Sequence, residues 1–230
     1  MIGRIQKLGV VLTVLGFVFV AGGAFAFYKA SEGMTSLQAY SAAQDVKLSY
    51  NDQGQLVDRG DPAQAQAILS LLEKDWGYPV VASDLNPADP LVNTATEYMY
   101  QMAVISYHTL HGTQTVVLPE DVTAADGTVY KAGTYEFAVD GRYWSDFDRS
   151  NPIEAAAREK AWTGTAHALI ANLGVGTVTA SALQLGLGLA GLFAGTGLFA
   201  LMTGLGLVWA TRAADEKRTK LALQPAPVPA

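Results

Sequence analysis

The sequence contains no cysteine among its 230 residues, and only 16% of its residues are charged. Without cysteine there is no disulfide framework, no cysteine-ligated zinc or iron-sulfur site and no thiol nucleophile. A soluble domain carries about 25% charged residues, so the low charge, with 50% hydrophobic residues, argues against a wholly soluble protein. The net charge of -6 argues against a nucleic-acid partner, because phosphate contacts require a basic surface.

Charge is absent from two long stretches of the chain. Residues 8–28 form an uncharged run of 21 residues, and a helix needs about 20 apolar residues to cross a bilayer. A second uncharged run covers residues 161–211. Its first part, 165–184, is rich in polar side chains and is expected to be a helical segment buried in protein or lying at the membrane interface. Transmembrane helices are therefore predicted at 8–28 and 185–211, with a split of 161–211 into two spans as the alternative.

The charged residues predict how these helices are oriented. The outer segments, 1–7 and 212–230, contain six basic and two acidic residues, whereas residues 29–164 contain nine basic and nineteen acidic residues. Short loops rich in Lys and Arg stay in the cytoplasm. We therefore expect a two-span plasma-membrane protein with both termini cytoplasmic and the acidic middle extracytoplasmic. The tail, 212–230, is expected to be disordered because it ends in a Pro/Ala-rich segment.

A cleaved signal peptide is the alternative for the first apolar run. Arg4 and Lys7 precede it, and residues 24–26 have the Ala-x-Ala pattern of a cleavage site. The run is longer than the 7 to 15 apolar residues of a typical signal peptide, which favours a retained membrane helix. Both alternatives export the middle segment.

Residues 29–164 have the mixed patterns of an α+β domain. Helices are predicted where polar cap residues precede apolar periodicity: from Asp61 to about Trp76, from Thr94 to Gly112 with a Thr94–Glu97 capping box, and from Asn151 onward. Strands are predicted from β-branched runs: 115–118, a hairpin of 128–130 with 134–139, and a weaker hairpin of 46–50 with 55–58. The predicted fold class is thus a membrane protein with two transmembrane helices flanking an α+β extracytoplasmic domain.

Small residues recur in both apolar runs at spacings that allow close helix contact. In the second run these residues are Gly186, Ala190, Gly191, Ala194 and Gly195, and in the first they are Gly9, Gly16, Gly22 and Gly23. They predict packing of the two helices against each other. The alternative is contact with a second copy or with another membrane protein, in addition to the lipid bilayer.

Two histidines provide the strongest candidate for chemistry. His108 and His111 are three residues apart on a predicted helix, so they share a face and could bind a divalent metal with a carboxylate from Asp146 or Asp148, or with His167. Two histidines and a carboxylate are the ligands of non-haem iron oxygenases. The competing interpretation is that the histidines only favour the helix C-terminus. No other cofactor motif is present.

Several segments resemble a group of actinobacterial two-span membrane proteins with no established function. The resemblance covers most of the chain, through Trp76-Gly-Tyr-Pro-Val, Leu91-Val-Asn-Thr-Ala-Thr-Glu-Tyr-Met, His108-Thr-Leu-His-Gly-Thr-Gln, Asp140-Gly-Arg-Tyr-Trp and Ala161-Trp-Thr-Gly-Thr-Ala-His. Members of this group often carry an automatic label as the small subunit of an aromatic ring-opening dioxygenase. The label implies a soluble helical subunit of a cytoplasmic iron enzyme, whereas this sequence predicts two spans and an acidic exported domain.

From these observations we expect a membrane-anchored extracytoplasmic binding or scaffolding module, with an accessory role in an envelope complex. The alternative function is an extracytoplasmic metal-dependent enzyme that uses His108, His111 and a carboxylate.

Overall fold

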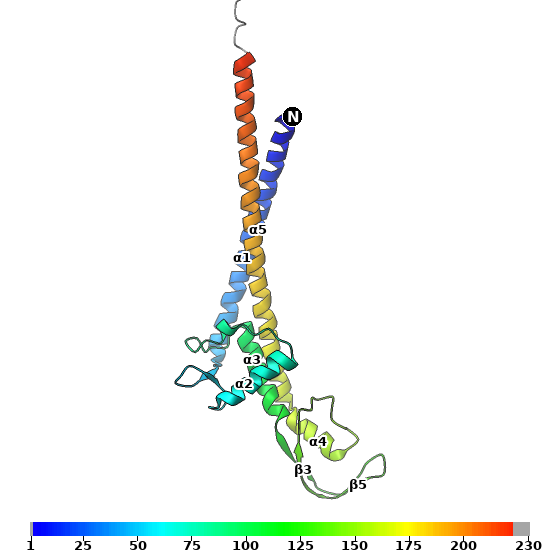
Figure 1. The fold of residues 1–230 in the computed structure, drawn as a ribbon. Helices are drawn as coiled ribbons and strands as arrows, with labels where there is room; N and C mark the ends of the chain where they lie inside the picture. Colours follow the sequence, from blue (N-terminus) through cyan, green and yellow to red (C-terminus); the bar gives the residue numbers. More distant parts are fainter. Residues whose placement is uncertain (1, 223–230) are drawn as a thin grey trace, which may run out of the picture. The chain divides into compact units, whose positions relative to one another are not determined.

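The computed structural model describes residues 2–222, which divide into two compact units (Figure 1). One unit combines the residues up to Ser36 with those from Ala182 onward, and the other covers Leu37–Ser181. Two long apolar helices, α1 (Ile2–Gln44) and α5 (Gly164–Ala222), flank a small α+β region. The predicted arrangement of two apolar helices around an α+β segment is confirmed.

Both long helices have the length and composition that crossing a membrane requires. In each, only 11% of the most apolar 18-residue window is buried, which differs from the core helix of a soluble protein. α5 is one continuous helix from Gly164, so no turn divides residues 164–211 of the uncharged run. The two helices also run beyond the predicted spans, α1 to Gln44 and α5 to Ala222.

The prediction of a disordered tail from residue 212 is wrong for residues 212–222, which continue α5 as helix. This segment is rich in Ala, Lys, Arg and Glu, which are strong helix formers, and the first proline comes later, at Pro225. The remaining tail, 223–230, with its Pro/Ala-rich segment, lies outside the described residues.

In the first unit, α1 and α5 run antiparallel, with small residues at the contact. A Cβ built on Gly16 would lie 2.6 Å from the Leu201 backbone nitrogen, and one on Gly23 would lie 2.9 Å from the Ala190 carbonyl oxygen. Gly9 and Gly204 face each other in the same way. Along both helices these contacts recur at intervals of seven residues, the period of a left-handed helix pair.

The predicted packing residues fall on two faces of α5. Ala190 is buried, Ala194 contacts Gly23, and a Cβ on Gly186 would lie 3.3 Å from the Ala30 Cβ. In contrast, Gly191 and Gly195 have no described atom within 4 Å of a built Cβ. The first set packs α5 against α1, and the second set faces away from it.

The helices of the second unit begin at the predicted caps. Asp61 caps α2 (Pro62–Ser70) by accepting from the Ala63 N–H at 2.7 Å. The turn that follows, η1 (Leu71–Asp75), is a π-helix, and η2 (Ala82–Asp84) is a single 3-10 turn.

Thr94 and Glu97 form the predicted capping box of α3 (Ala95–Leu110). Asn151 caps α4 (Pro152–Ala161), so all three predicted helices are confirmed.

Within residues 2–222 the strands form three separate antiparallel pairs. The predicted weak hairpin is present as β1 (Ser49–Tyr50) with β2 (Leu56–Val57). The longest pair joins β3 (Thr113–Leu118) to β6 (Gly133–Ala138), and the third pair joins β4 (Val122–Thr123) to β5 (Val129–Tyr130).

The predicted hairpin of 128–130 with 134–139 is wrong, because β5 and β6 pair with different strands. The tight turn lies earlier, where Gly127 has a φ of +86° and its N–H donates to the Ala124 carbonyl oxygen at 3.0 Å. The Asp121 carboxylate also accepts from the Lys131 ammonium and the Ala132 N–H, both at 2.8 Å. These two hydrogen bonds fix residues 131–132, which connect β5 to β6.

Two hydrophobic clusters form the core of the second unit. One lies between the β3–β6 pair and α4 and includes Val116, Val139 and Trp162. The other is centred on α2 and α3 and includes Ile68, Leu72 and Ala103. The first part of α5 packs on both clusters through Ile170 and Leu173. A Cβ on Gly176 would lie 2.7 Å from the Tyr98 ring, so glycine permits this close packing of α5 on α3.

The capping box places a carboxyl group in the core. Glu97 is 1% exposed, and its Oε2 accepts from the Asn93 N–H at 3.0 Å, the Thr94 N–H at 2.9 Å and the Thr94 hydroxyl at 2.9 Å. Burial raises the pKa of Glu97 above its ordinary value of 4.5, although these three donors oppose the shift.

This raised pKa predicts a pH dependence of folding. A carboxyl group with a higher pKa in the folded chain binds a proton more readily there, so its contribution to stability increases as pH falls from neutral through that pKa towards 4.5. Glu97→Gln removes the titration. Urea unfolding from pH 7 to pH 4.5 is expected to show wild type gaining stability relative to Glu97→Gln. A constant difference, or a gain for the variant, would contradict this.

Candidate functional site

A buried pair of ionisable side chains connects the turn after β2 to α3. The Asp58 Oδ2 lies 2.8 Å from the His108 Nε2, and the two side chains are 9% and 24% exposed. Asp58 directly follows β2, where a tight turn with positive φ at Arg59 and Gly60 leads into the Asp61 cap. The turn holds the Asp58 backbone, and α3 supplies the histidine.

Two tyrosines lie near this pair. The Tyr100 and Tyr50 hydroxyl oxygens are buried, and neither has a hydrogen-bond partner within residues 2–222. Burial raises the pKa of Tyr100 far above its ordinary value of 10.0, and the Asp58 carboxylate adds to the shift. Burial, followed by the charge of Glu97, raises the pKa of Tyr50. The Asp58 Oδ2 and the His108 Nε2 lie 2.8 Å apart, but their contact does not have the geometry of a hydrogen bond.

The other two histidines contact different neighbours. The His111 ring lies 4.1 Å from the Tyr107 ring, and its Nδ1 lies 2.8 Å from the Tyr107 carbonyl oxygen. His167, at the start of α5, packs edge to face against Trp144 at 5.1 Å. Each histidine is thus held by its own local contacts.

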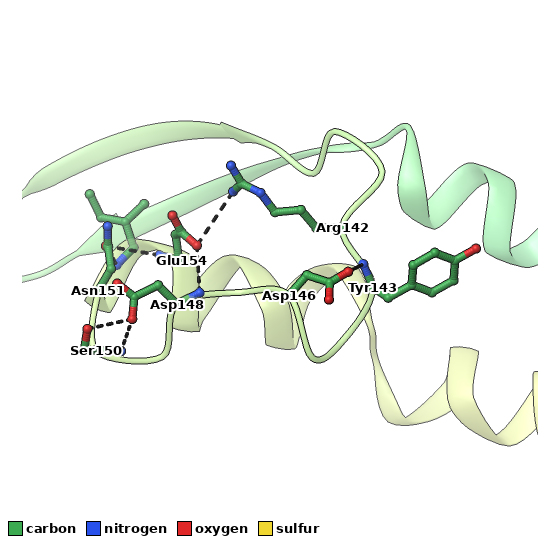
Figure 2. Close-up of polar contacts among 8 residues, drawn as sticks. Arg142, Tyr143, Asp146, Asp148, Ser150, Asn151 and Glu154 are labelled. Carbon is green, nitrogen blue, oxygen red and sulfur yellow. Dashed lines mark hydrogen bonds and ion pairs between the residues drawn. The ribbon is translucent and has the colours of Figure 1, made fainter.

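Asp146 and Asp148 lie in a loop that their own side chains stabilise (Figure 2). Asp146 accepts from the Tyr143 N–H at 2.9 Å. Asp148 accepts from the Ser150 hydroxyl at 2.6 Å and from its N–H at 2.9 Å, which holds the pKa of Asp148 below its usual value. The Asp148 N–H donates to Glu154 at 2.9 Å.

Aromatic side chains fix this loop to the rest of its unit. Phe147 is buried against Phe137, with their ring centroids 6.0 Å apart, and Tyr143 stacks on Trp162 at 5.8 Å. The Trp76 indole N–H donates to the Tyr143 hydroxyl at 2.8 Å. The carboxylates therefore lie on an anchored, exposed loop.

The predicted metal ligands do not form one cluster in the structure. Within residues 2–222, no group of three or more His, Asp or Glu side chains is placed to hold a metal ion. His108 instead contacts Asp58, and Asp146 and Asp148 accept hydrogen bonds from their own loop. Metal binding by these residues stays a prediction of the sequence.

A cavity of about 250 Å³ lies elsewhere in the second unit. It is formed by the end of α1, the segments around Val46 and Val92, one face of α3 and the first part of α5. Its lining residues are Tyr40, Ser41, Gln44, Val46, Val92, Tyr98, Gln101, Ile105, Leu169, Asn172 and Leu173. None of these residues is charged.

The buried floor of the cavity consists of Ser41, Val92 and Tyr98. The Ser41 hydroxyl donates to the Leu37 carbonyl oxygen at 3.0 Å and lies 2.6 Å from the Tyr98 hydroxyl. Since Ser41 has a single hydroxyl proton, Tyr98 donates to Ser41. Both protons are used within the protein, so the floor offers a ligand a mainly apolar surface.

The exposed rim of the cavity includes two amide side chains, Gln44 and Asn172, beside Tyr40 and Leu169. A third amide, Gln101, is half-buried on α3. These amides can donate and accept hydrogen bonds. The cavity thus combines an apolar floor with a polar, uncharged rim.

Sequence patterns did not identify Asp58, Tyr100 or this cavity. Asp58 begins the turn signal Asp-Arg-Gly-Asp, which predicts a bend but says nothing of burial. The cavity residues come from segments up to 133 positions apart, Tyr40 and Leu173 being the extremes. Only the tertiary fold brings them together.

Comparison with known proteins gives no relative from which a function follows. The chain matches no protein-family model, and no curated protein or solved structure is significantly similar to it.

Proposed function

We propose that this protein is a membrane-anchored module that displays its α+β unit on the extracytoplasmic side of the plasma membrane, where it binds or scaffolds other molecules. The observation that carries this proposal is the charge pattern around the two apolar helices. Their outer ends carry a net charge of +4, and residues 29–164 between them carry -10. Basic flanks stay in the cytoplasm, so the acidic segment is the exported one.

The antiparallel contact of α1 and α5 supports an even number of membrane crossings. Gly9, near the start of α1, meets Gly204, near the end of α5. The two ends of the chain therefore leave the helix pair on one side, as an even number of crossings requires. Large apolar side chains such as Phe17 and Phe199, each 69% exposed, cover the outside of the pair and suit contact with lipid.

The second face of α5 supports a role in a larger assembly. Gly191 and Gly195 point away from α1, and no described atom lies within 4 Å of a Cβ built on either glycine. Small residues on such a face allow another helix to approach closely. We propose that a second copy or another membrane protein packs there, which would make the chain an accessory subunit of an envelope complex.

A binding module accounts for the site better than a metal-dependent enzyme does. The side chains that could ligate a metal contact other protein groups, whereas the uncharged cavity has three amides at or near its opening. Small-molecule sites commonly combine an apolar pocket with a few polar groups.

Metal content decides between these two functions. We expect the full chain, purified in mild detergent and analysed by plasma mass spectrometry, to contain well under one metal ion per chain. The content should be the same in His108→Ala and His111→Ala. About one metal ion per chain in wild type, lost in both variants, would overturn the module and establish the metal centre.

A further inference from the structure

We infer that the cavity between α1, α3 and α5 binds a single-chain, uncharged amphiphile, with its hydrocarbon part on the floor and its polar group at the rim. This inference rests on the proposed function, because it names the ligand of the displayed unit. It depends on four properties of the cavity: its charge, the placement of its polar groups, its size and the apolar face of α5 that lines it.

The charge of the ligand follows from the lining. None of the eleven lining residues is Asp, Glu, Lys, Arg or His. A charged group inside would lose its hydration without gaining a counter-charge, and such desolvation is costly. A neutral ligand avoids this penalty.

The orientation of the ligand follows from the placement of its polar partners. The Ser41 and Tyr98 hydroxyl protons are already donated within the protein, and Val92 completes a mainly apolar floor. The Gln44 and Asn172 amides lie at the exposed rim. No hydrogen bond joins either amide to another protein group within residues 2–222, so both remain available to a hydroxyl or carbonyl group of a ligand.

The volume limits the ligand to one chain or one small ring. A cavity of about 150 Å³ holds benzene, and pockets for drug-sized molecules begin at about 300 Å³. At about 250 Å³ this cavity lies between them. It is too small for a two-chain lipid to be enclosed.

An apolar path on α5 favours a hydrocarbon chain over a ring. The rim residue Leu169, which is 46% exposed, and the half-buried lining residue Leu173 are four residues apart and therefore lie on one face of α5. A single acyl chain can pass along this apolar face from the rim to the floor.

Photo-crosslinking with a monoacylglycerol tests this inference. The probe carries a diazirine near the end of its acyl chain, and the full chain is held in lipid nanodiscs. In wild type we expect labelled peptides from the cavity, around Gln101 and Leu173, as well as from residues 8–28 and 185–211. Labelling of the two apolar helices is the internal reference, because the probe dissolves in the bilayer.

Two variants and a matched control test whether the labelling depends on the cavity. Ile105→Trp fills the cavity, and Asn172→Trp obstructs its exposed rim, where a larger side chain leaves the core unchanged. Both should lower cavity labelling about tenfold relative to the reference. Thr165→Trp, which is exposed on the same helix outside the cavity, should leave it unchanged.

The contrary results are equally specific. Wild-type labelling confined to the apolar helices, or cavity labelling that survives Asn172→Trp, would overturn the inference. So would equal labelling by the matching fatty acid, whose carboxylate should reduce cavity labelling about tenfold. Purified nanodiscs do not depend on orientation in the cell, so these failures are distinct from a failure of the proposed topology.

Discussion

Replacing His108 with alanine should destabilise the α+β unit by about 1–3 kcal/mol, the usual cost of leaving a buried polar group without its partner. The Asp58 side chain is 9% exposed, and its Oδ2 lies 2.8 Å from the His108 Nε2. Without the imidazole, the Asp58 carboxylate stays buried near Tyr100 and loses its contact with His108. Urea unfolding of the full chain in detergent, followed by tryptophan fluorescence, measures the loss.

His111→Ala is the matched control for this prediction. His111 lies one helical turn further along and is exposed, so its replacement should change the free energy of unfolding by less than about 1 kcal/mol. In the double variant Asp58→Asn/His108→Ala, part of the lost stability should return because the buried charge is gone. Equal losses for the two histidine variants would show that the Asp58–His108 pair does not stabilise the fold.

Gly16→Leu should separate α1 from α5. A Cβ at this position would lie 2.6 Å from the Leu201 nitrogen and 2.7 Å from the Gly197 carbonyl oxygen, so two helix backbones must move apart. Overpacking of this kind costs about 1–3 kcal/mol. A disulfide reports the separation: Ala30→Cys with Gly186→Cys places two Cβ atoms about 3.3 Å apart, close to the range that a disulfide spans. We expect the bond to form in the native sequence context and to be lost with Gly16→Leu.

Gly22→Leu is the control for the helix contact. No described atom lies within 4 Å of a Cβ built on Gly22, so leucine there should leave the disulfide intact. If Gly22→Leu abolished the bond and Gly16→Leu preserved it, the face through which α1 contacts α5 would be assigned incorrectly.

Local signals predicted most of the secondary structure. The caps at Asp61, Thr94 and Asn151 were identified because a helix N-terminus needs a side-chain acceptor for its first N–H groups, and that requirement is visible in a few consecutive residues. The two apolar helices were predicted from the length of the two uncharged runs, which is also visible in consecutive residues. Their continuation to Gln44 and Ala222 was missed, because charged residues mark the end of an apolar run but do not end a helix.

Local sequence signals could not predict contacts between segments that are far apart in the chain. Two turn-like sequences, near Gly127 and Gly133, could each close a hairpin. In the structure the turn at Gly127 joins β4 to β5, whereas Lys131 and Ala132 donate hydrogen bonds to Asp121. The pairing of Asp58 with His108 depends likewise on residues 50 positions apart. Sequence spacing placed His108 and His111 on one helix but could not show that they contact different partners.

Orientation in the membrane is the claim on which the proposed function depends, and single-cysteine labelling tests it most directly. Because the native chain has no cysteine, Glu120→Cys and Lys217→Cys each introduce one reactive thiol, at positions that are exposed in the structure. Intact cells are treated with a membrane-impermeant maleimide. We expect Glu120→Cys to react at once and Lys217→Cys to react only after the membrane is permeabilised. Reaction of Lys217→Cys in intact cells, with Glu120→Cys protected, would contradict the account.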